Sequence, residues 1–237
     1  MLALSRLADF ARLVRLAARM IAGRRYWIAP FLPLLWIGFQ VFRLVVALRP
    51  DDYGASEAQT ILIGFPLVVL AIGLGVKVIA GEIDRRTLEI AYTVPGGAHQ
   101  VWLAKLAAAV VLLTAALALL ALATFLFCTE FPLDALYGAM QGAIVYLVVS
   151  MALSALFKSE AVGALASAAV LTLNLVIQGG AQLRISPFWN PEAMPNADPA
   201  DLLAWTVQNR IGFVLAILAV VALGFGRAER REKLLGG

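Results

Sequence analysis

Residues 106–128 read LAAAVVLLTAALALLALATFLFC and contain no charged side chain. An α-helix needs about 20 mainly apolar residues to cross the roughly 30 Å hydrocarbon core of a bilayer. Segments 135–157 and 161–183 meet this requirement in the same way. The whole chain is 62% hydrophobic and 14% charged, whereas soluble domains are about half apolar and a quarter charged. The sequence therefore predicts an all-α polytopic membrane protein.

Two earlier segments, 26–48 and 58–81, are also long and apolar enough to span, but each contains one charged residue, Arg43 and Lys77 respectively. Both lie within about two turns of a span end, so snorkelling of their long side chains to the headgroups is the favoured interpretation. A charge that lines a polar pathway is the alternative, because charged residues inside membranes are often functional.

The last apolar segment, 211–226, is short for a span. It suffices if its helix begins near Leu202 and if Arg210 lies at the interface or in a protein-lined cavity. With this segment the sequence predicts six transmembrane helices. Small and polar residues within spans four and five are expected to pack the helices together: Gln141, Ser150, Ser154, Gly163, Ser167 and Asn174.

The basic residues between the spans predict the orientation, because cytoplasmic loops carry an excess of Lys and Arg. If the N-terminus is cytoplasmic, the outer side holds Arg49, Arg184 and Arg210. An even number of spans then places both termini in the cytoplasm, together with the loop between spans two and three. The inner side holds Arg6, Arg12, Arg15, Arg19, Arg24, Arg25, Arg85, Arg86, Lys105, Lys158, Arg227, Arg230, Arg231 and Lys233.

The first 25 residues predict an amphipathic helix that lies flat in the cytoplasmic interface. Arg12, Arg15 and Arg19 share one side of this helix, and the recurring arginines leave no uninterrupted apolar region for a cleaved signal. An ordinary cytosolic helix, the alternative, would lack a soluble core to pack on. The opposite side holds apolar residues at helical spacing: Leu4, Leu7, Phe10, Val14, Ala17 and Ile21.

Residues 184–209 form the predicted outer connection between spans five and six. Asp198 followed by Pro199 predicts the start of a short helix, with Asp as the N-cap. Phe188, Trp189 and Trp205 are predicted to be interfacial anchors, and a lid over an exit path is the alternative. A long regular helix is excluded by the prolines of this connection: Pro187, Pro191, Pro195 and Pro199.

The chain lacks the sequence motifs of common catalytic and cofactor sites. It has no G-x-x-x-x-G-K-[ST] loop, no H-E-x-x-H and no G-x-S-x-G. Cys128 is the only cysteine, His99 is the only histidine, and no carboxylate lies at mid-span. We therefore expect no catalytic, cofactor or metal site and no energy source on this chain. Nucleic acid is not expected as a partner either, because the basic residues flank apolar runs. An intramembrane enzyme is the weakest interpretation.

Residues 81–100, GEIDRRTLEIAYTVPGGAHQ, form a densely charged segment between two apolar spans. The pattern predicts a helix that Pro95 and the following two glycines terminate. Its charged residues and its hydrophobic edge, which includes Ile83 and Leu88, suit docking into a groove of a soluble partner. A solvated loop that obeys the positive-inside rule is the alternative, although Glu82, Asp84 and Glu89 are not explained by that rule.

This segment resembles the first cytoplasmic loop of the permease subunits of type-two ABC exporters. That loop reads approximately E-x-x-x-G-T-L-E-x-x-x-x-x-P, followed by a lysine at the start of the next span. The rest of the chain agrees with the resemblance, from the N-terminal helix and six spans to the long outer connection and the basic tail 226–235. Arg86 stands where the family usually has glycine. The matching residues are Glu82, Thr87, Leu88, Glu89, Pro95 and Lys105.

The resemblance implies a single permease domain, 1–237, of a multi-pass protein in a cell membrane, the inner or plasma membrane of a prokaryote. Two permease chains, identical or related, would assemble with two ATP-binding subunits that carry the ATP and Mg. The chain itself would be a transport subunit and not an enzyme, and it would export an amphipathic substrate. A self-contained channel or membrane scaffold is the alternative. The residues implied in coupling to the ATPase are Glu82, Asp84, Arg85, Arg86, Thr87, Leu88 and Glu89.

Overall fold

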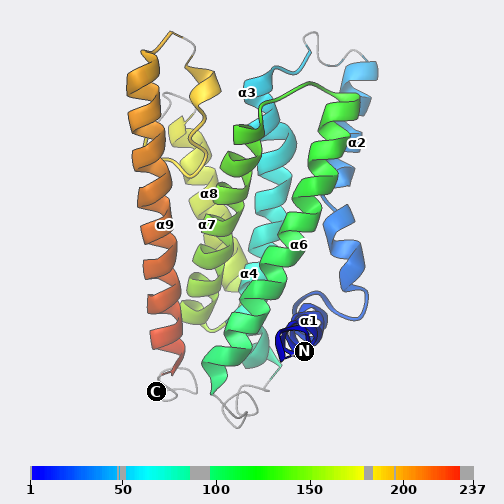
Figure 1. Ribbon diagram of the computed structural model, residues 1–237, viewed down its shortest axis with the longest axis vertical. Helices are drawn as coiled ribbons and strands as arrows, with labels where there is room; N and C mark the ends of the chain where they lie inside the picture. The colour runs from blue at the N-terminus through cyan, green and yellow to red at the C-terminus, as the bar shows by residue number, and fades with distance from the viewer. Residues whose placement is uncertain are drawn as a thin grey trace.

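The computed structural model describes residues 2–46, 48, 52–85, 97–178, 184–194 and 196–229, with side chains from residue 11 to 228. Every secondary-structure element in these ranges is helical. Six helical segments among them are long and apolar enough to cross a membrane, which confirms the predicted all-α fold and agrees with the six predicted spans. These six segments run side by side in one bundle (Figure 1).

Most of the spans are single helices, and two are composite. Span one joins a short 3₁₀-helix to α2, and span two joins α3, a π-helical stretch and α4 without a break. The first helix, α1, precedes the spans, and a 3₁₀ turn, η3, lies in the last connection. The bounds are α1 Leu2–Ala22, η1 Tyr26–Phe31, α2 Leu34–Val45, α3 Ala55–Glu57, η2 Ala58–Gly64, α4 Phe65–Asp84, α6 Ala98–Phe127, α7 Leu133–Phe157, α8 Glu160–Gln178, η3 Pro191–Ala193 and α9 Pro199–Glu229.

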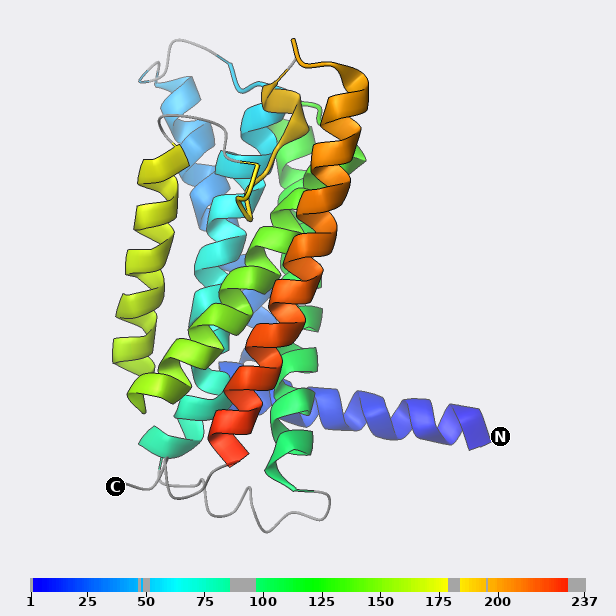
Figure 2. The same cartoon turned by 90° about the vertical axis from the view of Figure 1, so that its left-hand side faces the viewer.

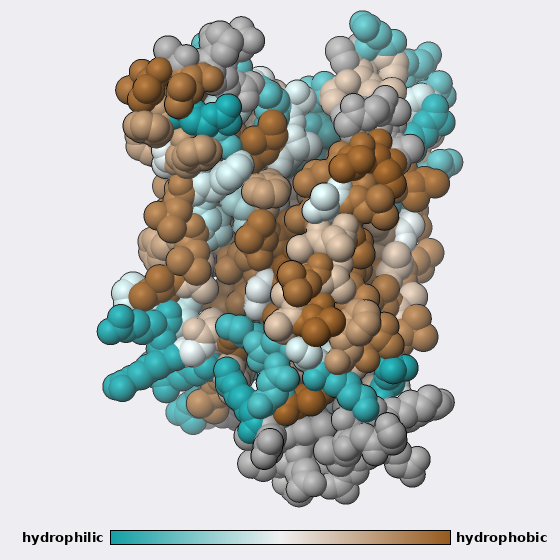
Figure 3. Space-filling view, turned by 180° about the vertical axis from the view of Figure 1, so that it is seen from behind, coloured by the Kyte–Doolittle hydropathy of each residue, from teal (hydrophilic) through white to brown (hydrophobic). Residues whose placement is uncertain are grey.

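The second span forms the centre of the bundle. In the most apolar 18-residue stretch of this span, 67% of the residues are buried. The corresponding value for the span formed by α9 is 11%. Apolar side chains cover the middle of the face shown in Figure 3, and hydrophilic side chains gather toward its ends. This distribution suits a protein whose middle lies in hydrocarbon, because exposed apolar surface is favourable there.

Helix α4 approaches α7 closely at Gly75. A Cβ atom added at Gly75 would overlap the backbone carbonyl of Leu147 and the hydroxyl of Ser150. A small residue at such a crossing lets the two backbones come together, as in other membrane bundles. Two residues earlier, a Cβ at Gly73 would meet open space.

Gly75→Val is therefore expected to destabilise the bundle by about 1–3 kcal/mol or more, because overpacking forces the helices apart. Gly73→Val, on the same helix, is the matched control and should change the free energy of unfolding by much less. Unfolding of the purified protein in detergent measures both. Equal effects of the two substitutions would show that close packing at Gly75 does not hold α4 against α7.

Helix α1 projects sideways from the bundle, across the direction of the spans (Figure 2). Its last turns bury Ala17, Ala18 and Ile21, and Gly23, with a φ of 79°, makes the turn into span one. A positive φ is a backbone conformation that glycine adopts readily. The arginines of the projecting part that the structure describes, Arg12, Arg15 and Arg19, are exposed.

The sixth span differs from its prediction in extent. The short helix predicted from Pro199 and the sixth span are one continuous helix, α9. The predicted N-cap is correct, since a side-chain oxygen of Asp198 accepts a hydrogen bond of 2.8 Å from the backbone N–H of Ala200. No proline follows within α9, so the cap starts a helix that continues through the span.

Candidate functional site

The candidate site lies where α4 ends and the charged segment begins. Glu82 is only 4% exposed. Its Oε1 accepts a hydrogen bond of 2.7 Å from Nζ of Lys105, and its Oε2 accepts one of 3.1 Å from Nε1 of Trp102. Lys105 is itself 2% exposed and also donates to the carbonyl of Val78 at 3.2 Å. A buried, hydrogen-bonded ion pair therefore joins the end of α4 to the start of α6.

The two side chains that donate hydrogen bonds to Glu82 lie on one face of the first turns of α6. Trp102 and Lys105 are three residues apart, which places them side by side on a helix. Trp102 is completely buried, and its ring lies 5.7 Å from that of Phe225 on α9. The indole thus serves both as a donor to Glu82 and as a packing contact between α6 and α9. Without these donors the carboxylate would be a buried, unpaired charge, which proteins avoid.

The next residues of the chain bind two further helices. A carboxylate oxygen of Asp84 accepts a hydrogen bond of 3.0 Å from the backbone N–H of Glu160, the first residue of α8. A guanidinium N–H of Arg85 donates to the carbonyl of Met20, near the C-terminal end of α1, at 3.2 Å. An acid at a helix N-terminus and a base at a helix C-terminus both interact favourably with the helix dipole.

Together these residues form what we call the loop-base cluster: Glu82, Asp84, Arg85, Trp102 and Lys105. It connects α4 to α6 directly and reaches α8 and α1 through Asp84 and Arg85. Residues on both sides of the segment 86–96 belong to this cluster. Arg85 precedes the segment, and Trp102 and Lys105 lie in the first turns of α6, which follows it. A displacement of the segment would therefore act on four helices at once.

The cluster changes the interpretation of Glu82. The sequence resemblance implied that Glu82 contacts an ATPase, but its carboxylate is buried against α6 and is not exposed to a partner. Its role in this structure is that of an internal anchor. Asp84 and Arg85 are exposed, as a docking surface requires, although each also holds a helix end. Arg86, Thr87, Leu88 and Glu89 lie outside the described residues.

Sequence reasoning did not assign Trp102 and Glu160 to this site. Lys105 was matched to the family pattern, but no partner was predicted for it. One signal was available: Glu82 and Lys105 are opposite charges at the facing ends of two apolar spans. Charges in such positions are expected to pair when the spans pack side by side.

Arg43 and Lys77 do not belong to one site. Arg43 is half-buried close to the C-terminal end of α2, where its guanidinium donates to the side chain of Gln40 at 3.4 Å and lies 6.0 Å from the ring of Phe39. The same Gln40 oxygen accepts a hydrogen bond of 2.7 Å from the Tyr53 hydroxyl. Lys77 is half-buried toward the other end of the bundle and makes no hydrogen bond or ion pair with another described residue.

At the end of the bundle opposite α1, residues 186–190 turn into the space between the helices (Figure 2). We call this stretch the re-entrant segment. Phe188 and Trp189 are 6% and 1% exposed, so the prediction that they are interfacial anchors is wrong. The Trp189 carbonyl accepts a hydrogen bond of 2.9 Å from the amide of Gln59 in the π-helical stretch, and the Trp189 indole donates to Thr206 on α9 at 2.9 Å.

The physical reason is that buried amides satisfy the backbone of the re-entrant segment. Asn209 donates to the carbonyls of Ser186 and Arg184 at 2.9 and 2.7 Å. Asn190 donates to the carbonyl of Ser56 at 2.9 Å. Non-helical backbone is tolerated at membrane depth only where the protein satisfies its polar groups. The buried amides of Asn209 and Gln59 do this for the carbonyls of Ser186 and Trp189.

A polar network fixes α9 against α7 beside this segment. Gln141 donates to Asn209 at 2.9 Å and accepts from Arg210 at 3.2 Å. Arg210 also forms an ion pair of 3.3 Å with Asp134 and lies 4.4 Å from the ring of Tyr137. Arg210 is thus bound by protein, which is one of the two positions predicted for it.

No protein-family model, no curated protein and no solved structure matches this chain. In the described part of the chain, no group of three or more His, Cys, Asp or Glu side chains is placed to hold a metal ion. The functional interpretation therefore depends on the loop-base cluster, the spans and the sequence pattern.

Proposed function

We propose that this chain is the membrane-spanning subunit of an ATP-driven transporter and that a separate ATPase subunit acts on the segment 81–100. The loop-base cluster is the observation that carries this proposal. Its buried pair Glu82–Lys105 gives the segment a rigid base. Asp84 and Arg85 extend that base to α8 and α1. A loop that only joined two spans would need no such connections.

In this proposal the end of the bundle that holds α1 faces the cytoplasm. The excess of basic residues at this end supports that orientation. The direction of α1 across the spans supports an interfacial position for α1, because a helix that runs across the spans follows the plane of the membrane (Figure 2). Its exposed arginines Arg12, Arg15 and Arg19 would face the headgroups and the cytoplasm.

The mechanism follows from the position of α4. An ATPase that moves the segment 86–96 would displace the end of α4, which holds Glu82. The ion pair between Glu82 and Lys105 would transmit this displacement to α6. Helix α4 is in turn packed tightly on α7 at Gly75, and α7 is bound to α9 by the network around Gln141 and Arg210. A push at the loop therefore reaches the end with the re-entrant segment through rigid helices, which can exchange between two packings.

The assembly would contain two permease chains, identical or related, and two ATP-binding subunits that carry the ATP and Mg. The chain itself would perform no chemistry. Export is what the family resemblance implies, and an apolar lumen would suit an amphipathic substrate. A self-contained channel or scaffold is the second candidate, and the exposed Asp84 and Arg85 at the loop base would then bind another kind of partner.

Purification of the tagged chain from its native membrane in a gentle detergent tests the proposal. We expect an ATP-binding protein to co-purify and to hydrolyse ATP. Leu88→Arg, in the hydrophobic edge of the segment, is expected to lower the co-purified ATPase at least tenfold, since a charge in a docking contact costs more than 1.4 kcal/mol. Glu130→Arg, a charge change at the exposed turn between α6 and α7, is the control and should retain the partner. Purification without any ATPase would favour the channel or scaffold.

A further inference from the structure

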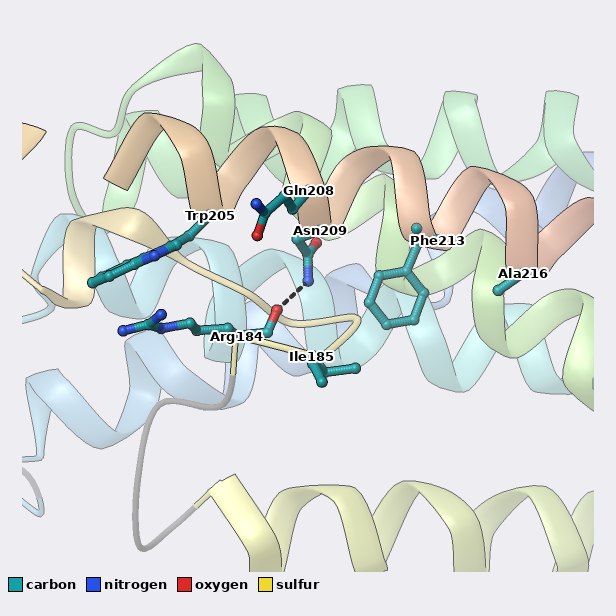
Figure 4. Close-up of a pocket in the computed structure, with 8 residues that line it drawn as sticks. Arg184, Ile185, Trp205, Gln208, Asn209, Phe213 and Ala216 are labelled. Carbon is teal, nitrogen blue, oxygen red and sulfur yellow. Dashed lines mark hydrogen bonds between the residues drawn. The ribbon is translucent and has the colours of Figure 1, made fainter. Parts of the chain in front are cut away.

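A groove of about 330 Å³ runs along one face of α9. Its lining residues on α9 follow helical spacing: Trp205, Gln208, Asn209, Gly212, Phe213 and Ala216. Arg184 and Ile185, from the connection before the re-entrant segment, complete it, and Figure 4 shows them beside Trp205 and Phe213. The volume lies at the lower end of the range of small-molecule sites.

The two ends of the groove differ in chemistry. At one end the guanidinium carbon of Arg184 lies 3.3 Å from the centroid of the Trp205 indole, beside the exposed amide of Gln208. This guanidinium makes no hydrogen bond or ion pair with another residue in the described ranges. Toward the middle of the bundle the lining is apolar or small, formed by Gly212 and Ala216 beside the ring of Phe213. An occupant that suits both ends has an anionic head and an apolar chain.

The length of the groove matches one leaflet of a bilayer. Trp205 and Ala216 are separated by about 16 Å along α9, at 1.5 Å per residue, and half of the hydrocarbon core is about 15 Å thick. Helix α9 is the least buried span, so the groove opens toward the lipid. Trp and Arg near a span end lie at the level of the headgroups. A head at Arg184 and a chain beside Gly212 would therefore have the normal depth of a membrane lipid.

We propose that this groove binds a membrane lipid whose phosphate headgroup carries a net negative charge, with the phosphate at Arg184 and one acyl chain along Gly212 and Ala216. The guanidinium is preorganised by its stack on Trp205 and can donate two hydrogen bonds to a phosphate. The proposal requires only that α9 spans the membrane. It is independent of the coupling to an ATPase, so either can fail without the other.

The test uses phosphatidic acid that carries a photoreactive diazirine in its acyl chain, with phosphatidylcholine of the same chains as the comparison. The purified chain is irradiated with each lipid at a subsaturating concentration, and the cross-linked peptides are mapped by mass spectrometry. We expect cross-links to 205–216 from phosphatidic acid, and at least fivefold fewer from phosphatidylcholine.

Two pairs of variants separate the site from general lipid contact. Arg184→Gln should lower the cross-linking of phosphatidic acid to 205–216 about tenfold, the effect of losing a charged hydrogen bond. Arg227→Gln, which removes an exposed charge near the other end of α9, should not. Gly212→Leu places a side chain in the groove, where a Cβ meets open space, and should abolish the cross-link. Gly226→Leu, equally open on the same helix, should leave it unchanged.

Equal cross-linking by the two lipids, or equal effects within either pair of variants, would overturn the proposal. A loss of dimer on Gly212→Leu without a change in lipid cross-linking would also overturn it, because the groove would then be covered by a second copy of the chain. Wild-type cross-links that fall on other helices but not on 205–216 would do the same.

Discussion

Lys105→Met is expected to lower the free energy of unfolding by about 3–5 kcal/mol, because it leaves the buried carboxylate of Glu82 without its cation. The pair is 2.7 Å apart, and both side chains are at most 5% exposed. The hydrogen bond from Trp102 alone does not compensate a full buried charge. Chemical unfolding of the purified protein in detergent measures the effect.

Two further variants make this expectation specific. Lys77→Met removes a half-buried lysine of α4 that pairs with no other described residue, and we expect it to cost less than about 1 kcal/mol. Glu82→Gln combined with Lys105→Met removes both charges, so most of the stability lost in Lys105→Met should return. If the double variant is as unstable as the sum of the single variants, the pair is not the element that joins α4 to α6.

Trp189→Ala is the second substitution with a large expected effect. Trp189 is fully enclosed by the bundle, its indole donates to Thr206, and its ring lies 6.4 Å from that of Trp205. Truncation of a buried tryptophan typically costs about 3–5 kcal/mol. We expect that loss of stability, together with release of the re-entrant segment.

Trp27→Ala is the matched control for Trp189→Ala, since Trp27 is 60% exposed at the start of span one. In detergent this substitution should cost less than about 1 kcal/mol. The accessibility of a cysteine introduced at Ser186, measured with a water-soluble thiol reagent after Cys128→Ser, reports the position of the segment. Trp189→Ala should raise its rate of labelling, and Trp27→Ala should not. Equal stability losses would mean that the re-entrant segment contributes little to the fold.

The sequence allowed the spans to be predicted because length and hydropathy are local properties. All of segment 106–128 except Cys128, the C-cap residue, lies within α6, and segment 135–157 lies within α7. The start of α9 was found for the same reason, since an Asp–Pro helix start is a local signal. The sequence also allowed the sixth span to begin near Leu202, but it treated the helix from Pro199 as a separate short helix, because the polar residues of its first turns suit a surface position.

The contacts that define the candidate site depend on tertiary packing. Glu82 and Lys105 are on separate helices, and their pairing required that α4 and α6 lie side by side. The burial of the re-entrant segment likewise depends on tertiary contacts that the local sequence does not indicate. The aromatic residues Phe188 and Trp189 suit a membrane interface as well as a buried segment. What decides between the two is the position of the amides of Gln59 and Asn209, which lie far away in the sequence.

Photo-cross-linking from the segment 81–100 tests whether the chain receives work from an ATPase there. A photoreactive amino acid at Ala91 is introduced in living cells and activated in the intact native membrane. We expect a cross-linked product of this chain with an ATP-binding protein on the cytoplasmic side. Cross-links from position 91 to lipid or to a protein outside the cell, with no ATP-binding protein among the products, would contradict it.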